Sequence, residues 1–566
     1  MPIAKRFSRG AAVKWLLVIL LAAGAVSPSH AVLRAKWRTS VANAPWAAEQ
    51  QLPVVAHTTQ ATEIDVDTTV QFQTMTGWGG SPNESSVLAL HKLPQALQDS
   101  VMRALFDTVS GCKFNMIRLP IGCSDFSLNG YSLDDSAGDD EMKYVNIHRD
   151  SLVTLDFVKK AVAVNPALKV WGSPWTAPAW MKANDNWSGG ASYPSTACEL
   201  HQDIATLTAY ALYFSKVVTL FKNDGIPFFA LAFQNEPYTC QPFPSMIWPD
   251  GATMLNFMKN YLGPRMKADH PDVELWTPTM NLNDSNYYIP MLRDSYCSSI
   301  ITTVCYQYQG EQVINYIHKK FPNLREYGTE LVCGGGDNQW NYPQSQTFPE
   351  IKLLVANGAS GAFQWNLLLA NGGWSAQWGT GAWQQNCMIT IDTIGKKIVY
   401  NSQYYGLKHL SYYIRPGSKV LKVTGQYDTN EISVKNPDGS IAVVTNNQNN
   451  APQNVAICVG SQMVTATLPA LSFASFLIYD STATGVNTAA VPDKPVPAPR
   501  TLKVNGDGFA LPHEYAQTSN ICAVYTLQGR LVREFSVRSG VVNLSKDYGM
   551  SRSIYIVRLR PDINRQ

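Results

Sequence analysis

The chain has 566 residues, more than one ordinary domain needs, and this length predicts two or three domains. Hydrophobic residues make up 45% of the chain and charged residues 15%, so the composition allows a large core. The formal net charge is +3 and basic residues do not cluster past residue 14, which excludes the electrostatic pattern of a nucleic-acid-binding protein.

Residues 1–31 have the pattern of an export signal. Lys5 and Arg9 precede the apolar run 15–26, and residues 29–31 form a small-x-small cleavage site. The run is too short to span a bilayer comfortably, so we expect a mature chain that starts near Val32, with a retained membrane anchor as the alternative. No later segment is apolar for long enough to predict a transmembrane helix.

All ten cysteines lie in the predicted mature part of the chain. Export makes disulfides feasible, but the spacing of the cysteines does not reveal their pairing. Cys112 and Cys123 flank a predicted strand at 114–119. Such a strand would hold them roughly 20 Å or more apart, too far for a bridge. No spacing of Cys and His resembles a zinc site, so neither a metal nor a cofactor is predicted.

Between residues 75 and 412 the sequence alternates short apolar runs with stretches of helical periodicity. The apolar runs lie at 76–80, 114–120, 168–174, 228–237, 273–278, 301–306, 324–330 and 361–366. The helical stretches between them include 96–109, 151–164, 204–221 and 254–266. Eight such alternations predict an α/β fold, a (β/α)8 TIM barrel with loop insertions.

The competing fold for this alternation is an open, doubly wound sheet. That fold normally carries a glycine-rich phosphate-binding turn after its first strand. The corresponding segment here, 76–80, reads Thr-Gly-Trp-Gly-Gly; it lacks the required spacing, and its Trp78 would block a pyrophosphate. The pattern therefore favours the barrel.

The segments on either side of the predicted barrel read as β-structure. From 413 to 480 the helical period gives way to short strand-like runs separated by turn residues, which predicts a side β-sandwich. The N-terminal segment 32–74 is expected to contribute a strand to it, at 63–72. Residues 481–500 are rich in Pro, Ala and Thr and predict an extended linker. Residues 501–566 predict a small separate β domain.

The most informative residues are Asn235-Glu236-Pro237, at the end of the fourth predicted strand. An apolar strand needs no charge there, whereas an active site at the carboxyl ends of barrel strands does. Glu330 closes the seventh run in the same way. Strands four and seven lie on opposite sides of a barrel mouth, so both side chains can point inward across it.

Two carboxyl groups that face each other across a cleft are what glycosidic bond cleavage requires. One protonates the leaving oxygen and the other attacks the anomeric carbon, and in retaining enzymes about 5–5.5 Å separates them. The acid must keep its proton near neutral pH, which a negatively charged neighbour favours. The alternative for Glu236 and for Glu330 is a surface or salt-bridged carboxylate.

Other residues near the strand ends fit the same chemistry. Arg118 can hold Glu330 ionised through a charge-assisted bond, or be an ordinary barrel ion pair. Asn235 can hydrogen-bond a sugar 2-hydroxyl. Four aromatic residues are candidates for the walls of a sugar site, with core packing as the alternative for each. They are Trp175, Trp180, Tyr306 and Trp365.

From residue 60 to 480 the chain resembles glycoside hydrolase family 30, which contains glucosylceramidases and β-1,6-glucanases. The motifs that carry the resemblance are 76–80, Arg118-Leu-Pro, 173–181, Gln234-Asn-Glu-Pro237, Thr329-Glu330, Gln364-Trp-Asn366 and 385–391. The resemblance implies a retaining mechanism with Glu236 as acid/base and Glu330 as nucleophile. It implies substrate contacts from Arg118, Asp125, Trp175, Asn235, Tyr306, Tyr308, Trp365 and Asn366. One departure is Tyr306, at a position where family members often have His.

The last residues, 501–566, are similar to the C-terminal sorting domains of the type IX secretion system of some Gram-negative bacteria. The elements that carry this similarity are Tyr525-Thr-Leu-Gln-Gly-Arg530 and Tyr555-Ile-Val-Arg558. Together with the predicted export signal, they imply a secreted or cell-surface bacterial enzyme that has contact with secretion machinery.

The sequence therefore predicts a secreted retaining hydrolase of β-glucosidic linkages, in a glucosylceramide-like β-glucoside or in β-1,6-glucan. A β-xylanase of the same family is the nearest alternative. A carbohydrate-binding protein without catalysis is an alternative of another class, and it would normally have lost one of the two carboxylates. A metal-dependent hydrolase is a third, and we expect no sensitivity to chelators.

Overall fold

The computed structural model describes residues 33–189, 197–238, 240–376, 378, 381–427, 430–481 and, further on, the strands between 500 and 561. The predicted export signal, residues 1–31, and the predicted linker, apart from Ser481 and Arg500, lie outside the described residues. The chain separates into two compact units, 1–486 and 487–566, and each is described by itself.

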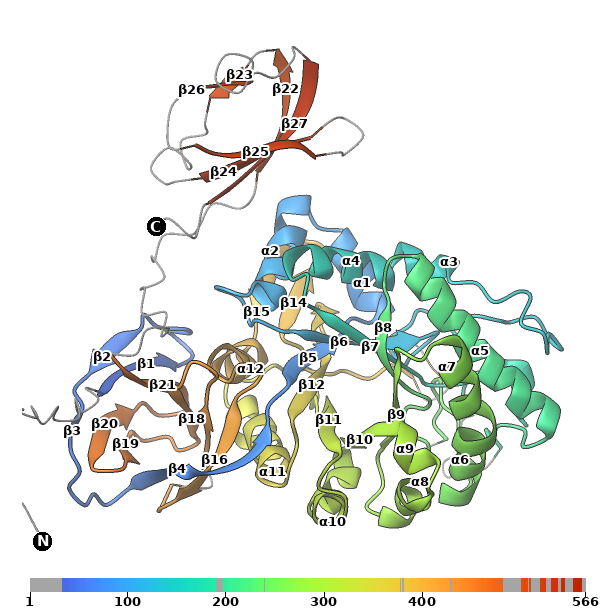
Figure 1. Cartoon of the computed structure of the whole chain (residues 1–566), viewed down its shortest axis with the longest axis horizontal. Coiled ribbons are helices and arrows are strands. Elements are labelled where there is room, and N and C mark those ends of the chain that lie inside the picture. Colours follow the sequence, from blue (N-terminus) through green and yellow to red (C-terminus); the bar gives the residue numbers. More distant parts are fainter. Residues whose placement is uncertain are drawn as a thin grey trace, which may run out of the picture. The chain divides into compact units, whose positions relative to one another are not determined.

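The centre of the first unit is a closed barrel of eight parallel strands (Figure 1), which confirms the predicted fold class. Each strand pairs with the next in the chain, and the eighth pairs with the first. The strands are β5 (Gly77–Ser81), β6 (Met116–Ile121), β7 (Lys169–Pro174), β8 (Phe228–Ala232), β9 (Glu274–Met280), β10 (Ile301–Gln307), β11 (Arg325–Leu331) and β12 (Gly361–Asn366).

Helices surround this barrel, because each connection between parallel strands must cross back over the outside of the sheet. They are α1 (Glu84–His91), α2 (Gln95–Phe106), α3 (His148–Leu152), α4 (Thr154–Val164), α5 (Ile204–Asn223), α6 (Gly251–Phe257), α7 (Gly263–Asp269), α8 (Ile289–Arg293), α9 (Cys297–Ile300), α10 (Ile314–Lys320), α11 (Phe348–Ala356) and α12 (Ser402–Tyr413). Shorter 3-10 and π turns are η1 (Ala179–Met181), η2 (Met258–Leu262), η3 (Ser285–Tyr287), η4 (Tyr308–Val313) and η5 (Pro343–Thr347).

α5 is apolar enough, and at 20 residues long enough, to cross a membrane by length and composition. This differs from the expectation that no segment after the export signal would pass that test. In the structure 61% of its most apolar window is buried. The composition of α5 is therefore accounted for by packing in the core of the first unit.

The barrel interior contains a layer of large side chains. Trp171 and Trp276 have ring centroids 4.9 Å apart, and Phe363 meets Trp171 edge to face. The backbones of β5 and β6 approach so closely that a Cβ on Gly79 would lie 2.2 Å from the carbonyl oxygen of Met116. The glycines of the 76–80 motif thus serve strand packing, and the aromatic layer forms a floor below the carboxyl ends of the strands.

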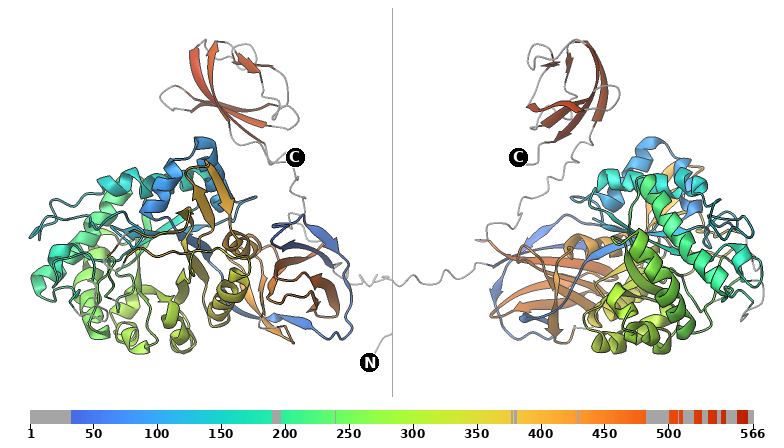
Figure 2. Two further views of the ribbon diagram at one scale, coloured as in Figure 1. Left: turned by 180° about the vertical axis from the view of Figure 1, so that it is seen from behind. Right: turned by 45° about the vertical axis from the view of Figure 1, so that its right-hand side comes forward.

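Beside the barrel lies a ten-stranded antiparallel-rich sheet that forms the sandwich (Figure 2). Its strand order is β2-β1-β21-β18-β17-β16-β4-β19-β20-β3. The bounds are β1 (Leu33–Ser40), β2 (Gln50–Leu52), β3 (Val55–Ala56), β4 (Glu63–Thr74), β16 (Lys419–Thr424), β17 (Glu431–Lys435), β18 (Ile441–Asn447), β19 (Gln453–Val459), β20 (Gln462–Leu468) and β21 (Ser472–Asp480). β4, the predicted N-terminal contribution, lies between β16 and β19 (Figure 1). Three more strands, β13 (Leu368–Ala370), β14 (Ile389–Asp392) and β15 (Lys397–Tyr400), form a small sheet after the barrel.

The second unit consists of β-strands among its described residues. β22 (Arg500–Gly506), β27 (Ser553–Pro561), β24 (Asn520–Tyr525) and β25 (Leu531–Val537) form an antiparallel sheet in that order. β23 (Gly508–Ala510) pairs with β26 (Val541–Asn543). This matches the predicted small β domain; the Tyr555-Ile-Val-Arg558 element lies on β27, and residues 526–530 of the other element lie outside the described residues.

Candidate active site

Glu236 lies just beyond the end of β8, and the backbone sets its position. The amide of Asn235 donates to the carbonyl of Pro174 at 2.8 Å, and that of Glu236 donates to the carbonyl of Thr279 at 3.2 Å. Glu236 has φ +44°, in the left-handed region that costs a residue with a Cβ of order 1–3 kcal/mol. Strain of this kind at the end of a barrel strand is typical of functional positions, and Glu236 keeps partial exposure.

Glu330, on β11, is held by side chains instead. Arg118 forms a buried ion pair with its Oε2. The hydroxyl of Tyr308 donates to Oε1 at 2.5 Å, and Nε2 of Gln307 donates to Oε2 at 3.2 Å. Three donors, one of them a guanidinium, fix the orientation of this carboxyl group. Only 5% of Glu330 is exposed.

Arg118 also fixes the amide of Asn235. Its Nη2 donates to Oδ1 of Asn235 at 2.5 Å, and Gln307 and Thr279 donate to the same oxygen at 3.0 and 3.1 Å. Because the oxygen receives all three donors, the Nδ2 group must point the other way. Among the described residues Nδ2 has no hydrogen-bond acceptor, so it is available to a ligand.

Glu330 is surrounded by hydrogen-bond donors, whereas Glu236 lies near other carboxyl groups. Burial in the cleft, followed by the negative charges of Glu330 and Asp125, raises the pKa of Glu236 to about 8. Arg118 and a hydrogen bond with Asn281 oppose this shift. Glu236 therefore holds its proton at neutral pH. Arg118 and Gln307 each bond both Glu330 and Asn235, the residue before Glu236, so the two glutamates belong to one site.

Aromatic rings form one wall of this site. Trp175 and Trp365 are stacked, with ring centroids 4.8 Å apart, and the Arg118 guanidinium lies 4.7 Å from the centroid of Trp175. Phe126 meets Trp365 edge to face. Stacked indole faces of this kind suit the apolar face of a sugar ring.

Asp125 adjoins this wall and completes the polar part of the site. Burial, then the charge of Glu330, raises the pKa of Asp125 to about 8. The indole nitrogen of Trp378 donates to the carbonyl of Asp125 at 2.8 Å. A hydrogen bond from Trp365 opposes this shift in the pKa of Asp125, so the two side chains are partners at this wall. A carboxyl group has further hydrogen-bonding positions, which a ligand with hydroxyl groups can use.

Two predicted substrate contacts are wrong, and both errors concern orientation. Tyr306 points out of the barrel, because Cys305 before it points inward and strand residues alternate. Its buried hydroxyl donates to Glu326 at 3.0 Å. Asn366 has no exposed surface; its Oδ1 accepts from Asn83 at 2.9 Å and its Nδ2 donates to Gln385 at 2.6 Å. Both side chains stabilise the protein rather than face the cleft.

A third aromatic candidate, Trp180, lies outside the site as well. Its indole nitrogen donates to the carbonyl of Asp134 at 3.2 Å, and its ring packs against the outer core. The site instead contains residues that the sequence did not single out, Gln307, Thr279 and Asn281. Gln307 could have been found by continuing the alternation of β10 one residue beyond Tyr306.

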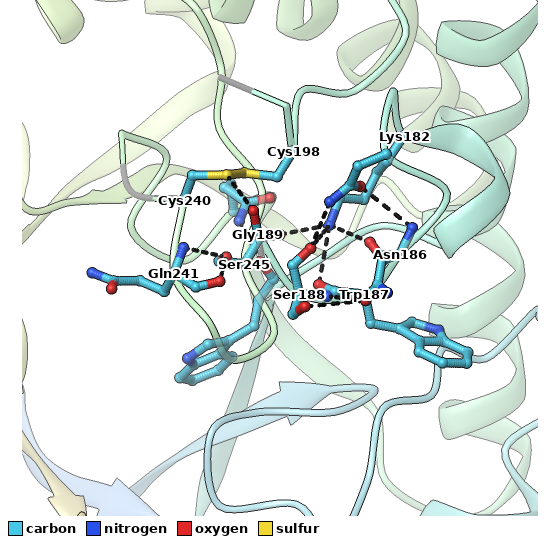
Figure 3. The surroundings of a disulfide bond; sticks show 12 residues. Lys182, Asn186, Trp187, Ser188, Gly189, Cys198, Cys240, Gln241 and Ser245 are labelled. Carbon is cyan, nitrogen blue, oxygen red and sulfur yellow. Dashed lines mark hydrogen bonds between the residues drawn. A yellow bond between two sulfur atoms is a disulfide. The ribbon is translucent and has the colours of Figure 1, made fainter. Parts of the chain in front are cut away.

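The chain that follows Glu236 is fixed by a second, separate set of contacts (Figure 3). A disulfide joins Cys198 to Cys240. Close by, the fully buried ammonium group of Lys182 donates to four carbonyl oxygens and has no carboxylate partner among the described residues. The acceptors are Asn186 at 2.6 Å, Ser245 at 2.7 Å, Trp187 at 3.0 Å and Ser188 at 3.5 Å. Lys182 thereby ties segment 186–188 to the segment that follows the disulfide.

The other cysteines of the described residues are free. Cys112 and Cys123 are both buried and unpaired, as the predicted strand between them requires. The remaining six free cysteines are also buried.

Comparisons with known proteins converge on one family. Residues 75–414 match the model of the glycosyl hydrolase family 30 TIM-barrel domain, and residues 417–476 match that of the family 30 beta sandwich domain. The endo-1,6-beta-D-glucanase neg1 of Aspergillus fumigatus is 26% identical over 407 residues, covering 68% of this chain and 80% of that protein. The lysosomal acid glucosylceramidase of Mus musculus is 24% identical over 409 residues, covering 67% and 76%. Among solved structures, the endo-beta1,6-glucanase BT3312 superposes with a TM-score of 0.68 at 25% identity, covering 78% of this chain and 99% of that one.

Proposed function

The chain belongs to glycosyl hydrolase family 30, and from this premise we propose that it cleaves β-glucosidic linkages by double displacement, with net retention at the anomeric carbon. The observation that carries the proposal is the contrast between its two glutamates. Glu330 is paired with a guanidinium and two further donors, whereas the pKa of Glu236 is raised to about 8. One group is prepared to attack and the other to donate a proton.

In the first step Glu236 donates its proton to the leaving oxygen while a carboxylate oxygen of Glu330 attacks the anomeric carbon. The C–O bond to the leaving group breaks, and an ester between Glu330 and the sugar forms. Because the charge of Glu330 is one cause of the raised pKa of Glu236, ester formation lowers that pKa. Glu236 then accepts a proton from water, the water oxygen attacks the anomeric carbon from the opposite face, and Glu330 leaves as a carboxylate.

The other site residues act on the sugar and on Glu330. The free Nδ2 of Asn235 can donate to the 2-hydroxyl, a contact that strengthens in the oxocarbenium-like transition state. The rings of Trp175 and Trp365 offer an apolar face, and Asp125 offers a partner for hydroxyl groups. Arg118 and Tyr308 hold Glu330 in the orientation that attack requires.

The test is the stereochemistry of hydrolysis. When an aryl β-glucoside is hydrolysed and followed by proton NMR, β-glucose should appear first and α-glucose only later, by mutarotation. Initial α-glucose would contradict the retaining mechanism. Glu330→Gln at wild-type rate would contradict hydrolysis by these two glutamates, and would leave a carbohydrate-binding protein as the better description.

For the substrate we propose a β-glucoside of the kinds that the names of the relatives contain, β-1,6-glucan or glucosylceramide. The alternative, a β-xylanase, is favoured by no residue of the site, since the xylanases among the solved structures are 18–19% identical and share the fold only. Hydrolysis of β-1,6-glucan, glucosylceramide and glucuronoxylan, measured side by side, separates the three.

We also propose that the enzyme is exported and reaches the outside of a bacterial cell. The proposal rests on the sequence patterns of residues 1–31 and 501–566. Expression with and without residues 501–566, followed by activity measurements in medium and cell fractions, tests it. Equal amounts of enzyme in the medium for both forms would contradict the sorting role of the tail.

A further inference from the structure

A pocket with a volume of about 300 Å³ opens on the nucleophile side of the site. It adjoins the catalytic centre through Tyr308, whose hydroxyl donates to Glu330, and through Val332, two residues after that nucleophile. Its lining comes from η4, the end of β11, η5 and α11. The lining residues are Tyr308, Gln309, Glu311, Gln312, Val332, Gln346 and Glu350.

Six of the seven lining residues carry hydrogen-bonding side chains, and Val332 is the exception, while apolar atoms form the larger part of the lining surface. Gln309 and Gln346 are exposed and have no side-chain hydrogen bond with another described residue. Gln312 accepts from Asn283 at 2.8 Å, which leaves its own amide hydrogens for another partner. Unpaired amides around a concave surface recognise neutral ligands that have many hydroxyl groups.

The floor of the pocket is a pair of carboxyl groups. Glu311 is 4% exposed, and a side-chain hydrogen bond joins it to Glu350. Glu350 accepts from the amide of Val332 at 3.0 and 3.2 Å. Burial, then the neighbouring Glu350, raises the pKa of Glu311 to about 10, and burial raises the pKa of Glu350 to about 8. Near neutral pH the pair therefore carries little charge, which suits a neutral ligand.

The size and the chemistry of the pocket both argue against a lipid chain as its ligand. A volume of about 300 Å³ lies at the lower end of small-molecule sites, roughly 300–1,000 Å³, and suits one sugar ring rather than long alkyl chains. An alkyl chain would bury the amides of Gln309 and Gln346 without partners, at a penalty of about 1–3 kcal/mol for each group.

We propose that this pocket is a second sugar subsite, which binds the glucose residue adjacent to the one that Glu236 and Glu330 act on. The inference rests on the proposed function and deepens it, because it selects a β-glucan over a glycolipid as substrate. Gln309 and Gln346 are the specificity-determining residues, and the Glu311–Glu350 pair forms the base on which the sugar lies.

The experiment compares Gln309→Leu, Gln346→Leu and the double variant with wild type on three substrates: p-nitrophenyl β-glucoside, a β-1,6-linked glucotriose and glucosylceramide. Each lost hydrogen bond should raise KM for the trisaccharide by about 5-fold, and the double variant by about 25-fold. The kcat/KM for the aryl glucoside should stay within about 2-fold of wild type, because its nitrophenyl group has no hydroxyl groups that could bond the two glutamines. Gln51→Leu, an exposed glutamine on β2 of the sandwich, is the matched control and should change neither constant.

The outcomes separate the two proposals. If wild type hydrolyses the aryl glucoside with retention but the double variant leaves KM for the trisaccharide unchanged, or impairs all substrates equally, the subsite is refuted and the hydrolase stands. Faster wild-type hydrolysis of glucosylceramide than of the trisaccharide also refutes the subsite. If wild type hydrolyses none of the three, the proposed β-glucoside hydrolase itself fails, and the subsite with it.

Discussion

Around Glu330 three side chains donate hydrogen bonds to one carboxylate, from Arg118, Tyr308 and Gln307. Around Glu236 the carboxyl groups of Glu330 and Asp125 raise its pKa, and Arg118 opposes them. The two glutamates are chemically identical and both lie at the carboxyl ends of barrel strands. Their neighbours orient one of them through donors and raise the pKa of the other, a contrast that fits the roles of nucleophile and acid that we propose.

The two glutamates also differ in what holds them in position. Glu330 is oriented through its side chain, whereas Glu236 is oriented by the backbone: its φ is +44°, its amide bonds Thr279, and the next carbonyl, that of Pro237, accepts from Trp248 at 2.7 Å. Substitution of a residue that donates to Glu330 should therefore impair the attack by Glu330. Changes that loosen the segment after Pro237 should impair proton transfer by Glu236.

The largest effect is expected for Glu330→Ala, which removes the nucleophile that we propose. Because no glycosyl ester can form, kcat on an aryl β-glucoside should fall by about 10⁴-fold or more. Azide fits the space that the carboxylate leaves and should restore activity through a single inversion, giving α-glucosyl azide. Recovery of β-glucosyl azide from this variant would assign the nucleophile to another residue.

Glu236→Ala should cost roughly 10²–10⁴-fold, the usual contribution of a general acid or base, on a substrate with a poor leaving group. With 2,4-dinitrophenyl β-glucoside the first step needs no proton, so the glycosyl ester should accumulate and appear in mass spectra of the intact protein. Azide then attacks from the opposite face, and two inversions give β-glucosyl azide. The configuration of the azide product in the two alanine variants thus distinguishes the two glutamates directly.

Tyr308→Phe removes one donor from Glu330 and leaves the ring in place. A hydrogen bond to a charged group contributes about 1.5–3 kcal/mol, so kcat should fall by about 10- to 100-fold. Tyr306→Phe is the matched control, because its hydroxyl binds Glu326 outside the barrel. The control should lower Tm and leave kcat within about 2-fold. An equal loss of kcat in both variants would mean that Tyr308 acts through stability and not through Glu330.

The protonation of Glu236 sets the alkaline limit of activity. An acid catalyst works only while protonated, so kcat/KM should fall as pH rises through the raised pKa of about 8. Arg118, Glu330 and Asp125 all face this carboxyl, and the observed value belongs to the group as a whole. Asp125→Asn removes one of the negative charges that raise the pKa, so the alkaline limb should move to lower pH. A limb that stays in place or moves to higher pH would contradict this assignment.

The barrel and the positions of its two glutamates were predictable from sequence, because both depend on local patterns. Apolar runs of strand length alternate with helical stretches, and Glu236 and Glu330 stand where two of those runs end. Parallel strands present their carboxyl ends on one side of the barrel, so position along the chain translates into position in space. The resemblance to a family added the remaining names, including Asp125 and Trp365.

The errors arose where orientation depends on residues far away in the chain. Tyr306 and Gln307 are neighbours, and only the register of β10 in the barrel decides which of them points inward. Asn366 is held by Asn83, 283 residues earlier, and the carbonyl oxygens around Lys182 leave no trace in residue types. The pocket beside Tyr308 is lined by η4, η5 and α11, which tertiary packing brings together. Such contacts follow from tertiary packing, which periodicity does not contain.

Lys182→Met should have the smallest effect on rate, and it should affect the step that depends on Glu236 rather than the one that depends on Glu330. Methionine fills the space, but four carbonyl oxygens lose their donor, so Tm should fall and the segment after Glu236 should loosen. A displaced acid impairs only steps that need its proton. We therefore expect kcat to fall about 3- to 10-fold on a β-1,6-linked trisaccharide and to change little on 2,4-dinitrophenyl β-glucoside. Lys216→Met, an exposed lysine on α5, should change neither rate nor Tm. Equal losses on both substrates would show that Lys182 supports the whole site, and that the two glutamates are not positioned independently.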